Sequence, residues 1–182
     1  SPIVALRCRQ RLPNAAKMWL DWGPGLATAQ GLVGTESLAY AFEVRPAFRA
    51  SFGCERVNRG AQCMPALGMR LSFSAPVARE TLTKISVTDA TGRAYPVSVD
   101  GNDGDASAQG LRIAGPLPAR THFKVTLPPD LVDDAGRALA NAERFPLEVA
   151  TDEDPPLAKF AARFGIVELA GDAALPVTVR NL

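Results

Sequence analysis

The sequence lacks several features on which common functions depend. Its 182 residues include no apolar run that approaches the roughly 18 residues needed to cross a bilayer. The formal net charge is only +1, so no excess of positive charge favours nucleic acid or an anionic membrane surface. No secretory signal pattern stands at Ser1, and an exported parent protein would be represented here by a mature or internal segment. We expect no nucleic-acid partner and no direct insertion of this segment into a membrane.

Catalytic and metal-binding patterns are also missing. The chain has a single histidine, His122, and its neighbours Thr121 and Phe123 give no support to a catalytic triad built on it. One histidine and three separated cysteines cannot build a convincing tetrahedral zinc site. The sequence therefore predicts a protein that is not an enzyme and that uses no cofactor or metal.

Two acidic stretches deserve comparison with calcium sites. The run Asp100–Asp105 fails the EF-hand pattern, because Gly104 occupies the fifth position and Leu111 the twelfth. A solvated turn is the better interpretation, with a looser calcium site as the alternative. The second stretch, Asp130–Asp134, carries three aspartates, for which we expect contact with solvent or capping of a turn.

What the chain does have is turn residues and short alternating segments. Fifteen prolines and fifteen glycines are spread along it, and long helical patterns are nearly absent. Met69, Leu71 and Phe73 alternate with polar residues, which is typical of a strand with one buried face. Pro76 is expected to end that strand. Further strands are expected at Phe48–Phe52, Ile85–Val87, Tyr95–Val99, Leu111–Ile113, Phe123–Leu127 and Phe145–Val149.

The chain also repeats itself. Segment Leu12–Val44 aligns with Leu117–Val149 at an offset of 105 residues without a gap. Seven of the 33 pairs are identical. They include Leu12/Leu117, Pro13/Pro118, Pro24/Pro129, Leu26/Leu131, Gly31/Gly136, Glu43/Glu148 and Val44/Val149. A period near 100 residues is the length of a β-sandwich domain, so the chain is interpreted as part of an array of such modules.

The repeat and the strand pattern divide the chain into three parts. Residues 47–152 hold about seven strands and are expected to form a complete immunoglobulin-like sandwich. Residues 1–46 match only the second half of such a module. The acidic, proline-containing stretch Asp152–Pro156 is a linker, and residues 153–182 would carry it into the opening strands of a further module. The predicted fold class is all-β, with immunoglobulin-like sandwiches in tandem.

The three cysteines and two tryptophans suggest structural roles. Cys54 and Cys63 bracket a polar, turn-rich loop, and a disulfide between them would suit an oxidising compartment. Two reduced thiols are the alternative, and Cys8 is left over as a buried thiol or as half of a bond to a partner elsewhere. Trp22 aligns with Leu127, an inward position, whereas Trp19 aligns with Lys124, an outward one. Trp19 is therefore a candidate interface residue.

A family resemblance rests on several short stretches of the sequence. Met69–Val77, together with Leu117–Pro118, Phe123–Leu127 and Asp133–Gly136, resembles a bacterial immunoglobulin-like module. Val44–Asn58 and Pro155–Glu168 are similar to N-terminal regions of bacterial alpha-2-macroglobulin-like proteins. Members of that family are large periplasmic proteins, often anchored by a lipid to a membrane, that trap proteases after cleavage of a bait region.

The resemblance implies a role in presenting other parts of a larger protein. Some members bond the protease through a Cys-x-Glu-Gln thioester, but none of the three cysteines here stands in that motif. The expected partners are neighbouring domains and, through the parent, proteases or envelope proteins. The alternative is a stalk module of a bacterial surface adhesin or cell-wall-associated protein, in which similar arrays occur. A carbohydrate-binding module would need an exposed row of aromatic residues, for which only Trp19 is a candidate.

Overall fold

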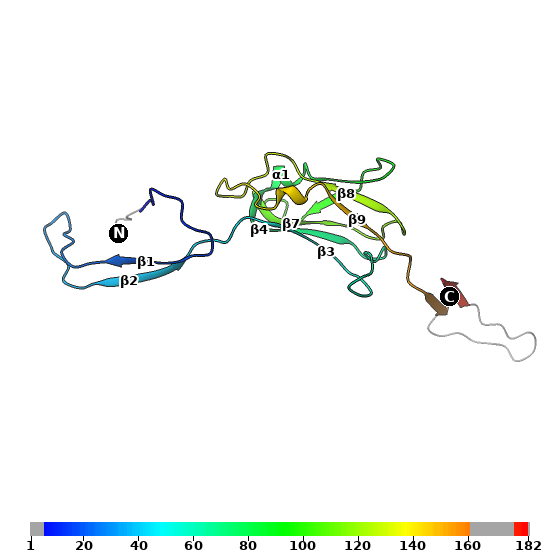
Figure 1. Ribbon diagram of the computed structural model, residues 1–182, viewed down its shortest axis with the longest axis horizontal. Helices are drawn as coiled ribbons and strands as arrows, with labels where there is room; N and C mark the ends of the chain where they lie inside the picture. Colours follow the sequence, from blue (N-terminus) through cyan, green and yellow to red (C-terminus); the bar gives the residue numbers. More distant parts are fainter. Residues whose placement is uncertain (1–5, 161–176, 182) are drawn as a thin grey trace, which may run out of the picture. The chain divides into compact units, whose positions relative to one another are not determined.

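The computed structural model describes residues 6–160 and 177–181, and the chain divides into two units between Ala47 and Phe48. Part of the further module expected at residues 153–182 lies outside the described residues. Figure 1 shows the elements of each unit in sequence colours.

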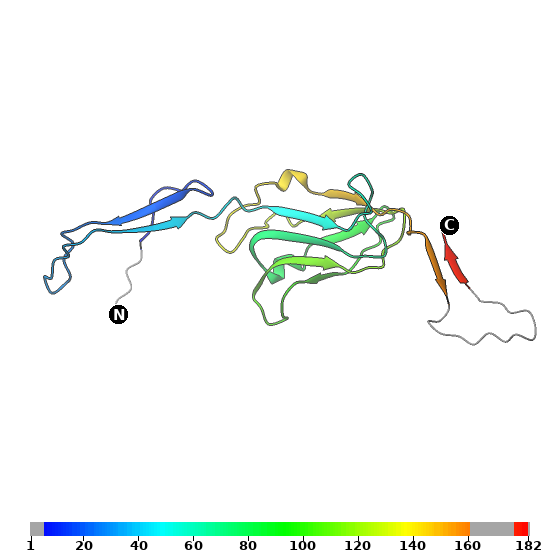
Figure 2. The same cartoon turned by 90° about the horizontal axis from the view of Figure 1, so that it is seen from below.

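The first unit contains one antiparallel hairpin, made of β1 (Lys17–Trp22) and β2 (Leu38–Glu43). Its strands pair only with each other among the described residues, as the two blue arrows in Figure 2 show. Alternation places large apolar side chains on one face and mostly polar or small ones on the other. Two strands cannot bury such a face between them, and it stays open to solvent.

The second unit contains a β-sandwich of seven strands in two antiparallel sheets. One sheet has the order β3-β4-β7-β6 and the other the order β5-β8-β9. The first sheet comprises β3 (Ala50–Cys54), β4 (Met69–Ala78), β7 (Ser107–Ile113) and β6 (Val97–Val99). The second comprises β5 (Ser86–Asp89), β8 (His122–Thr126) and β9 (Leu147–Ala150). The prediction of an all-β fold is thus confirmed.

Alternating residues from both sheets fill the core. Leu71 of β4, Leu111 of β7 and Val125 of β8 are completely buried. Phe48 stacks on Phe73 with ring centroids 6.0 Å apart, and Tyr95 meets Phe123 edge to face at 5.0 Å. Buried side chains of both sheets belong to one hydrophobic cluster.

Strand β4 runs further than the sequence predicted. Pro76 does not end it, because the pairing of β4 with β7 shifts between Ser72 and Val77. The missing N–H of Pro76 therefore removes no ladder hydrogen bond, as is usual at a bulge. Two short helices were not predicted, namely α1 (Arg79–Leu82) and the 3₁₀ helix η1 (Ala142–Arg144). The acidic stretch Asp130–Asp134 lies in turns and contains no helix.

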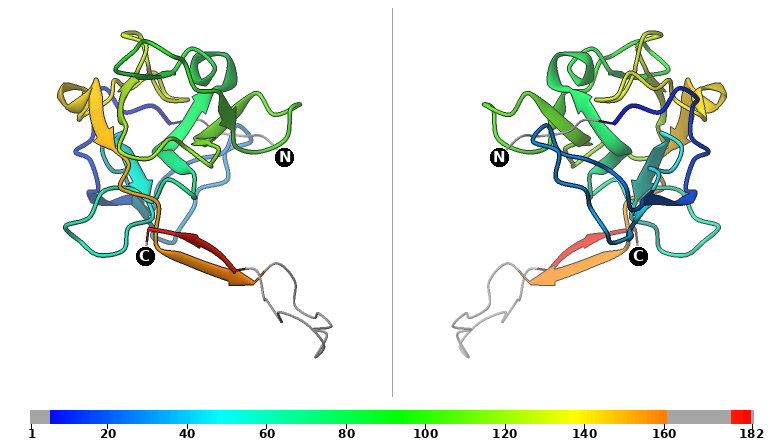
Figure 3. Two further views of the ribbon diagram at one scale, coloured as in Figure 1. Left: turned by 90° about the vertical axis from the view of Figure 1, so that its right-hand side faces the viewer. Right: turned by 90° about the vertical axis from the view of Figure 1, so that its left-hand side faces the viewer.

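A second hairpin follows the sandwich, formed by β10 (Leu157–Phe160) and β11 (Val177–Arg180). Its strands, orange and red in Figure 3, are antiparallel. Asp154 connects to it through an ion pair with Arg180 at 3.3 Å and a hydrogen bond from the Asn181 side chain to its carbonyl.

The backbone repeats several local features at the offset of 105 residues. Ala15 and Arg120 both have positive φ, at 56° and 50°. The bridge between Ala27 and Val33 recurs between Val132 and Ala138. In both turns a glycine in the left-handed region donates its N–H to the carbonyl three residues earlier, Gly31 to Thr28 and Gly136 to Asp133. The two segments therefore share one turn geometry.

The gapless alignment is nevertheless wrong beyond this turn. Lys17 pairs with Glu43, but His122 pairs with Ala150, so the second strand of the hairpin is offset by 107 residues. The two additional residues lie in the connection that carries Asn141 and η1 to the edge of β3. Because the shift is even, the same face of each hairpin remains apolar.

Candidate functional site

The candidate site is the end of the sandwich where the chain leaves β9, called the exit below and comprising residues 150–153. A disulfide lies next to it, between Cys54 at the end of β3 and Cys63, with Cα atoms 5.5 Å apart. The predicted disulfide is therefore present in the structure. Between the two cysteines, residues 55–60 are exposed. The Met64 N–H donates to the Glu55 carbonyl at 2.8 Å and closes the base of the loop.

Cys63 ties this loop to the exit through its backbone. Its N–H donates to the carbonyl of Ala150 at 3.0 Å, and its carbonyl accepts the N–H of Asp152 at 2.8 Å. These two bonds make a parallel bridge between Cys63 and Thr151. The Cys63 side chain is only 1% exposed, so the disulfide is packed against the core and the exit rests on a fixed support.

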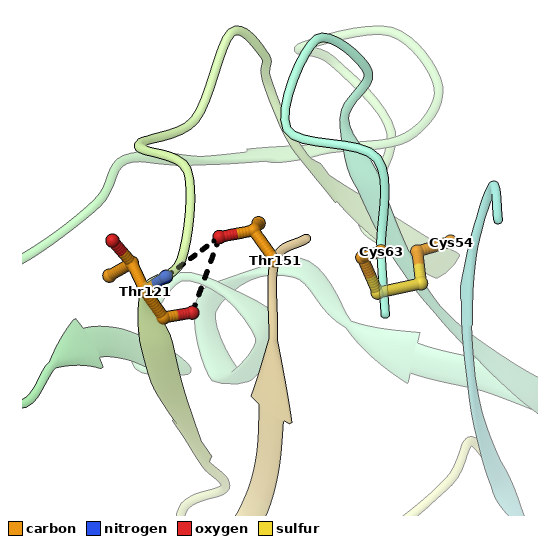
Figure 4. Close-up of a disulfide and its surroundings, with 4 residues drawn as sticks. All are labelled: Cys54, Cys63, Thr121 and Thr151. Atoms are coloured by element: carbon orange, nitrogen blue, oxygen red, sulfur yellow. Dashed lines mark hydrogen bonds between the residues drawn. A yellow bond between two sulfur atoms is a disulfide. The ribbon is translucent and has the colours of Figure 1, made fainter. Parts of the chain in front are cut away.

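Thr151 holds the exit from the other side. Its buried hydroxyl accepts the Thr121 N–H at 3.0 Å and donates to the Pro118 carbonyl at 2.6 Å. The Thr151 N–H also donates to the Thr121 carbonyl at 3.0 Å. Figure 4 shows the hydroxyl of Thr151 directed at Thr121, with the disulfide on the opposite side of the strand. One buried hydroxyl thus satisfies two backbone groups of the connection before β8.

Arg120 extends these contacts into the linker. Its left-handed backbone directs its N–H to the Asp152 carbonyl at 3.1 Å. Its guanidinium forms an ion pair with Glu153. Both charged groups are exposed, so the pair contributes little to stability and its main effect is on the direction of the chain.

The first unit uses the same backbone arrangement with fewer side-chain contacts. The Ala15 N–H donates to the Arg45 carbonyl at 3.4 Å, and the Val44 N–H donates to the Ala16 carbonyl at 2.9 Å. Val44 stands where the sandwich has Thr151, so the hydroxyl bonds are missing there. The arrangement at the exit can position a following segment, and it presents no activated nucleophile or acid–base pair.

The other residues singled out in the sequence are scattered. His122 is exposed at the start of β8, opposite Ala150. Trp19 is 62% exposed and lies on the face of its hairpin opposite to Trp22. Cys8 is a free, exposed thiol. None of them contributes to the exit. Thr151 and Arg120 were missed, because a threonine and a positive-φ arginine carry no distinctive signal in a sequence.

The acidic stretches are held by arginines to different degrees. Asp100 is not the solvated residue expected, since its carboxylate lies between Arg70 at 2.7 Å and Arg112 at 3.1 Å. These arginines are directly opposite each other on β4 and β7, and Asp100 offsets their repulsion.

Among the described residues no group of three or more histidine, cysteine or acidic side chains is arranged to hold a metal ion.

Asp133 caps its turn, which is one of the two roles expected for this acidic stretch. Burial alone would raise the pKa of the Asp133 carboxyl, but it is outweighed by hydrogen bonds from the N–H groups of Arg137 and Ala135 and by the Arg137 guanidinium. The resulting pKa lies below the usual value. The guanidinium approaches Oδ2 to 2.6 Å. The equivalent Thr28 accepts the Leu32 N–H in the first unit, so the turn needs an oxygen there but not a charge.

A further polar cluster closes the turn after β5. A hydrogen bond from the Thr91 hydroxyl, with others from Tyr95 and from the Arg93 and Thr91 backbone, lowers the pKa of Asp89 despite partial burial. Burial and the adjacent Asp89 carboxylate raise the pKa of Tyr95. Arg93 lies over the Tyr95 ring at 5.5 Å. Each group has a structural partner, which accounts for the cluster without any substrate.

Comparisons with family models, with curated proteins and with solved structures found no match to this chain. In the part of the chain that the structure describes, no helix is long and apolar enough to span a membrane.

Proposed function

We propose that residues 47–152 are a non-catalytic, immunoglobulin-like structural module in the arm of a periplasmic alpha-2-macroglobulin-like protein. In this role the module sets the distance and direction between neighbouring domains. Protease trapping, or another defence of the cell envelope, would be carried out by the whole parent, with any bait region or thioester elsewhere.

The observation that carries the proposal is the order of the strands. In chain order β3 to β9 correspond to strands A to G of a constant-type immunoglobulin domain, whose sheets have the orders A-B-E-D and C-F-G. The orders β3-β4-β7-β6 and β5-β8-β9 match both sheets. The disulfide departs from the antibody pattern, because it joins the end of β3 to the following loop and not the two sheets. It supports the extracytoplasmic assignment all the same.

The exit supports a role in positioning. Backbone bonds from Cys63, the Thr151 hydroxyl and the Arg120–Glu153 pair all act on residues 150–153. The first unit leaves its hairpin through equivalent backbone bonds. The same turn geometry and the same exit geometry recur in two units, which supports a tandem array. In such an array each module would direct the chain into the next module with a defined orientation.

A trapping assay on the parent protein tests this proposal. A protease enclosed by the parent would still cleave a small chromogenic peptide but would lose activity on a large protein substrate. We expect that pattern with the intact parent, and its loss when residues 48–152 are replaced by a flexible glycine–serine linker. If the parent leaves both activities unchanged, the macroglobulin assignment is wrong. Adhesion of cells that display the parent, lost on the same replacement, would then favour the stalk alternative.

A further inference from the structure

The β1–β2 hairpin of the first unit has an apolar face that is largely exposed to solvent. Met18, Leu20 and Trp22 of β1 lie opposite Phe42, Tyr40 and Leu38 of β2. Trp22 is 38% exposed, Tyr40 55% and Phe42 44%. Six large apolar side chains on one side of a two-stranded ribbon are the mark of a surface that another element covers.

We infer that this face is an interface for a four-stranded antiparallel sheet of the same kind as β3-β4-β7-β6, supplied by the same polypeptide on the N-terminal side of the hairpin. The inference rests on the proposed modular arrangement and adds to it the partner of the first unit. The hairpin would then be the last two strands of a preceding sandwich.

The β8–β9 pair of the intact sandwich identifies the occupant. It shares with the hairpin the positive-φ residue before its first strand, the backbone bridge in its turn and the left-handed glycine. The positions of Met18 and Leu20 correspond there to Phe123 and Val125, which are 1% and 0% exposed. Leu20 is 37% exposed and Met18 is half-buried, whereas their counterparts in the sandwich are fully buried.

The covering residues in the intact sandwich define the chemistry of the partner. Phe123 and Val125 belong to one cluster with Leu71 and Phe73 of β4 and Ile113 of β7. These residues alternate along their strands and come from a sheet whose opposite face is polar. A surface of this kind matches the apolar face of β1–β2 in width and in periodicity, whereas a helix would match neither.

Hydroxyl-radical footprinting with mass spectrometry tests the inference without any substitution. The chain has only two tryptophans, Trp19 and Trp22, and they lie on opposite faces of β1. In the 182-residue chain we expect both tryptophans and Tyr40 to be oxidised readily. In the parent protein we expect oxidation of Trp22 and Tyr40 to fall well below that in the 182-residue chain, because their counterparts Leu127 and Leu147 are partly buried against the core. The exposed Val57 of the disulfide loop should react equally in both proteins.

Three results would overturn the inference. Trp22 and Tyr40 could react as readily in the parent as in the 182-residue chain, which would leave the face uncovered. Protection of Trp19 with Trp22 still open would place the contact on the other face. A dimer of the 182-residue chain that protects Trp22 and is dissociated by Leu20→Glu, but not by Asp21→Asn, would identify a second copy as the occupant. A parent that protects Trp22 but traps no protease would refute the proposed activity and leave this interface standing.

Discussion

The side-chain amide of Asn141 pairs with both backbone groups of Ala50. Its Oδ1 accepts the Ala50 N–H at 3.0 Å and its Nδ2 donates to the Ala50 carbonyl at 2.8 Å. Asn141 is 3% exposed, and 91 residues separate it from its partner. The amide therefore takes the place of a strand partner for Ala50, which satisfies the edge of β3 at its first residue and hinders pairing with another chain there.

Replacing Asn141 should destabilise the sandwich. Asn141→Ala leaves a buried N–H and a buried carbonyl without partners, which costs about 1–3 kcal/mol for such groups. We expect a correspondingly lower free energy of unfolding in urea, together with a greater tendency to aggregate. Asn102→Ala, at an exposed position in the β6–β7 loop, is the matched control and should behave like the wild type. Equal stability of the two variants would contradict the role given to Asn141.

The contrast between Met69 and Asn141 shows how far the sequence alone leads. The alternation that begins at Met69 predicted β4 and its buried face, because side-chain direction in a strand depends only on local periodicity. No local pattern distinguishes Asn141 from an ordinary loop residue, since its partner is distant in the chain. The even register shift of β9 was hidden for a related reason: it is seen only in which residues pair across the sheet, and those pairs are distant in the chain.

The exit was predictable only in part. The disulfide between Cys54 and Cys63 was predicted from the polar, turn-rich loop that the two cysteines bracket. The role of the Thr151 hydroxyl could not be predicted from the sequence, because its hydrogen-bond partners Thr121 and Pro118 are brought beside it only by the folded sheet. The prediction that Pro76 ends β4 was wrong, because the bulge that accommodates this proline depends on the pairing of β4 with β7 and cannot be predicted from the proline alone.

Loss of the disulfide should weaken the sandwich measurably. Closing a loop of this length stabilises a protein by at most about 3 kcal/mol through the unfolded chain. We expect Cys54→Ser with Cys63→Ser to lower the midpoint of thermal unfolding, and Cys8→Ser, which removes the free exposed thiol, to leave it unchanged. Intact mass before and after reduction should differ by the two hydrogens of one disulfide, with one alkylatable thiol beforehand. Three alkylatable thiols in protein from an oxidising compartment would exclude the bond.

The Asp133–Arg137 pair should make stability depend on acid pH. The folded pKa of Asp133 is lowered, whereas an unfolded aspartate titrates near about 3.9. The Asp133–Arg137 pair therefore contributes its full stabilisation at pH values above the unfolded pKa. This stabilisation is lost as the pH falls through the lower, folded pKa of Asp133. We expect Asp133→Asn to be less stable than the wild type at pH 7, and the difference to shrink below about pH 4. Asp130→Asn, at an exposed neighbouring position, should show no such difference. A pH-independent loss in Asp133→Asn would assign the effect to packing.

His122 should be dispensable for any activity of the parent. The side chain is exposed at the start of β8, the central strand of its sheet, and the described structure gives it no acid, base or nucleophile partner. His122→Ala and His122→Gln should both leave protease trapping within the error of the assay. A large loss in both variants, with unchanged thermal unfolding, would contradict the non-catalytic assignment.

Thr151 offers the sharpest test of the exit as a positioning device. Thr151→Val keeps the shape of the side chain but removes the hydroxyl that serves the Thr121 N–H and the Pro118 carbonyl. Leaving buried polar groups unpaired costs about 1–3 kcal/mol. Thr151→Ser is the matched control, because it keeps the hydroxyl and loses only a methyl group, worth about 0.8 kcal/mol.

We expect Thr151→Val to accelerate hydrogen exchange at the Thr121 amide and at Asp152, whose N–H bonds to Cys63, and Thr151→Ser to do so much less. The same residues guide the chain into the linker, so trapping by the parent should weaken in Thr151→Val even at temperatures where the sandwich remains folded. If Thr151→Val speeds exchange but leaves trapping unchanged, the hydroxyl stabilises the module without directing its neighbour. Equal exchange in the two variants would remove the hydroxyl from the account of the exit altogether, and would leave the backbone bridge to Cys63 as its principal support.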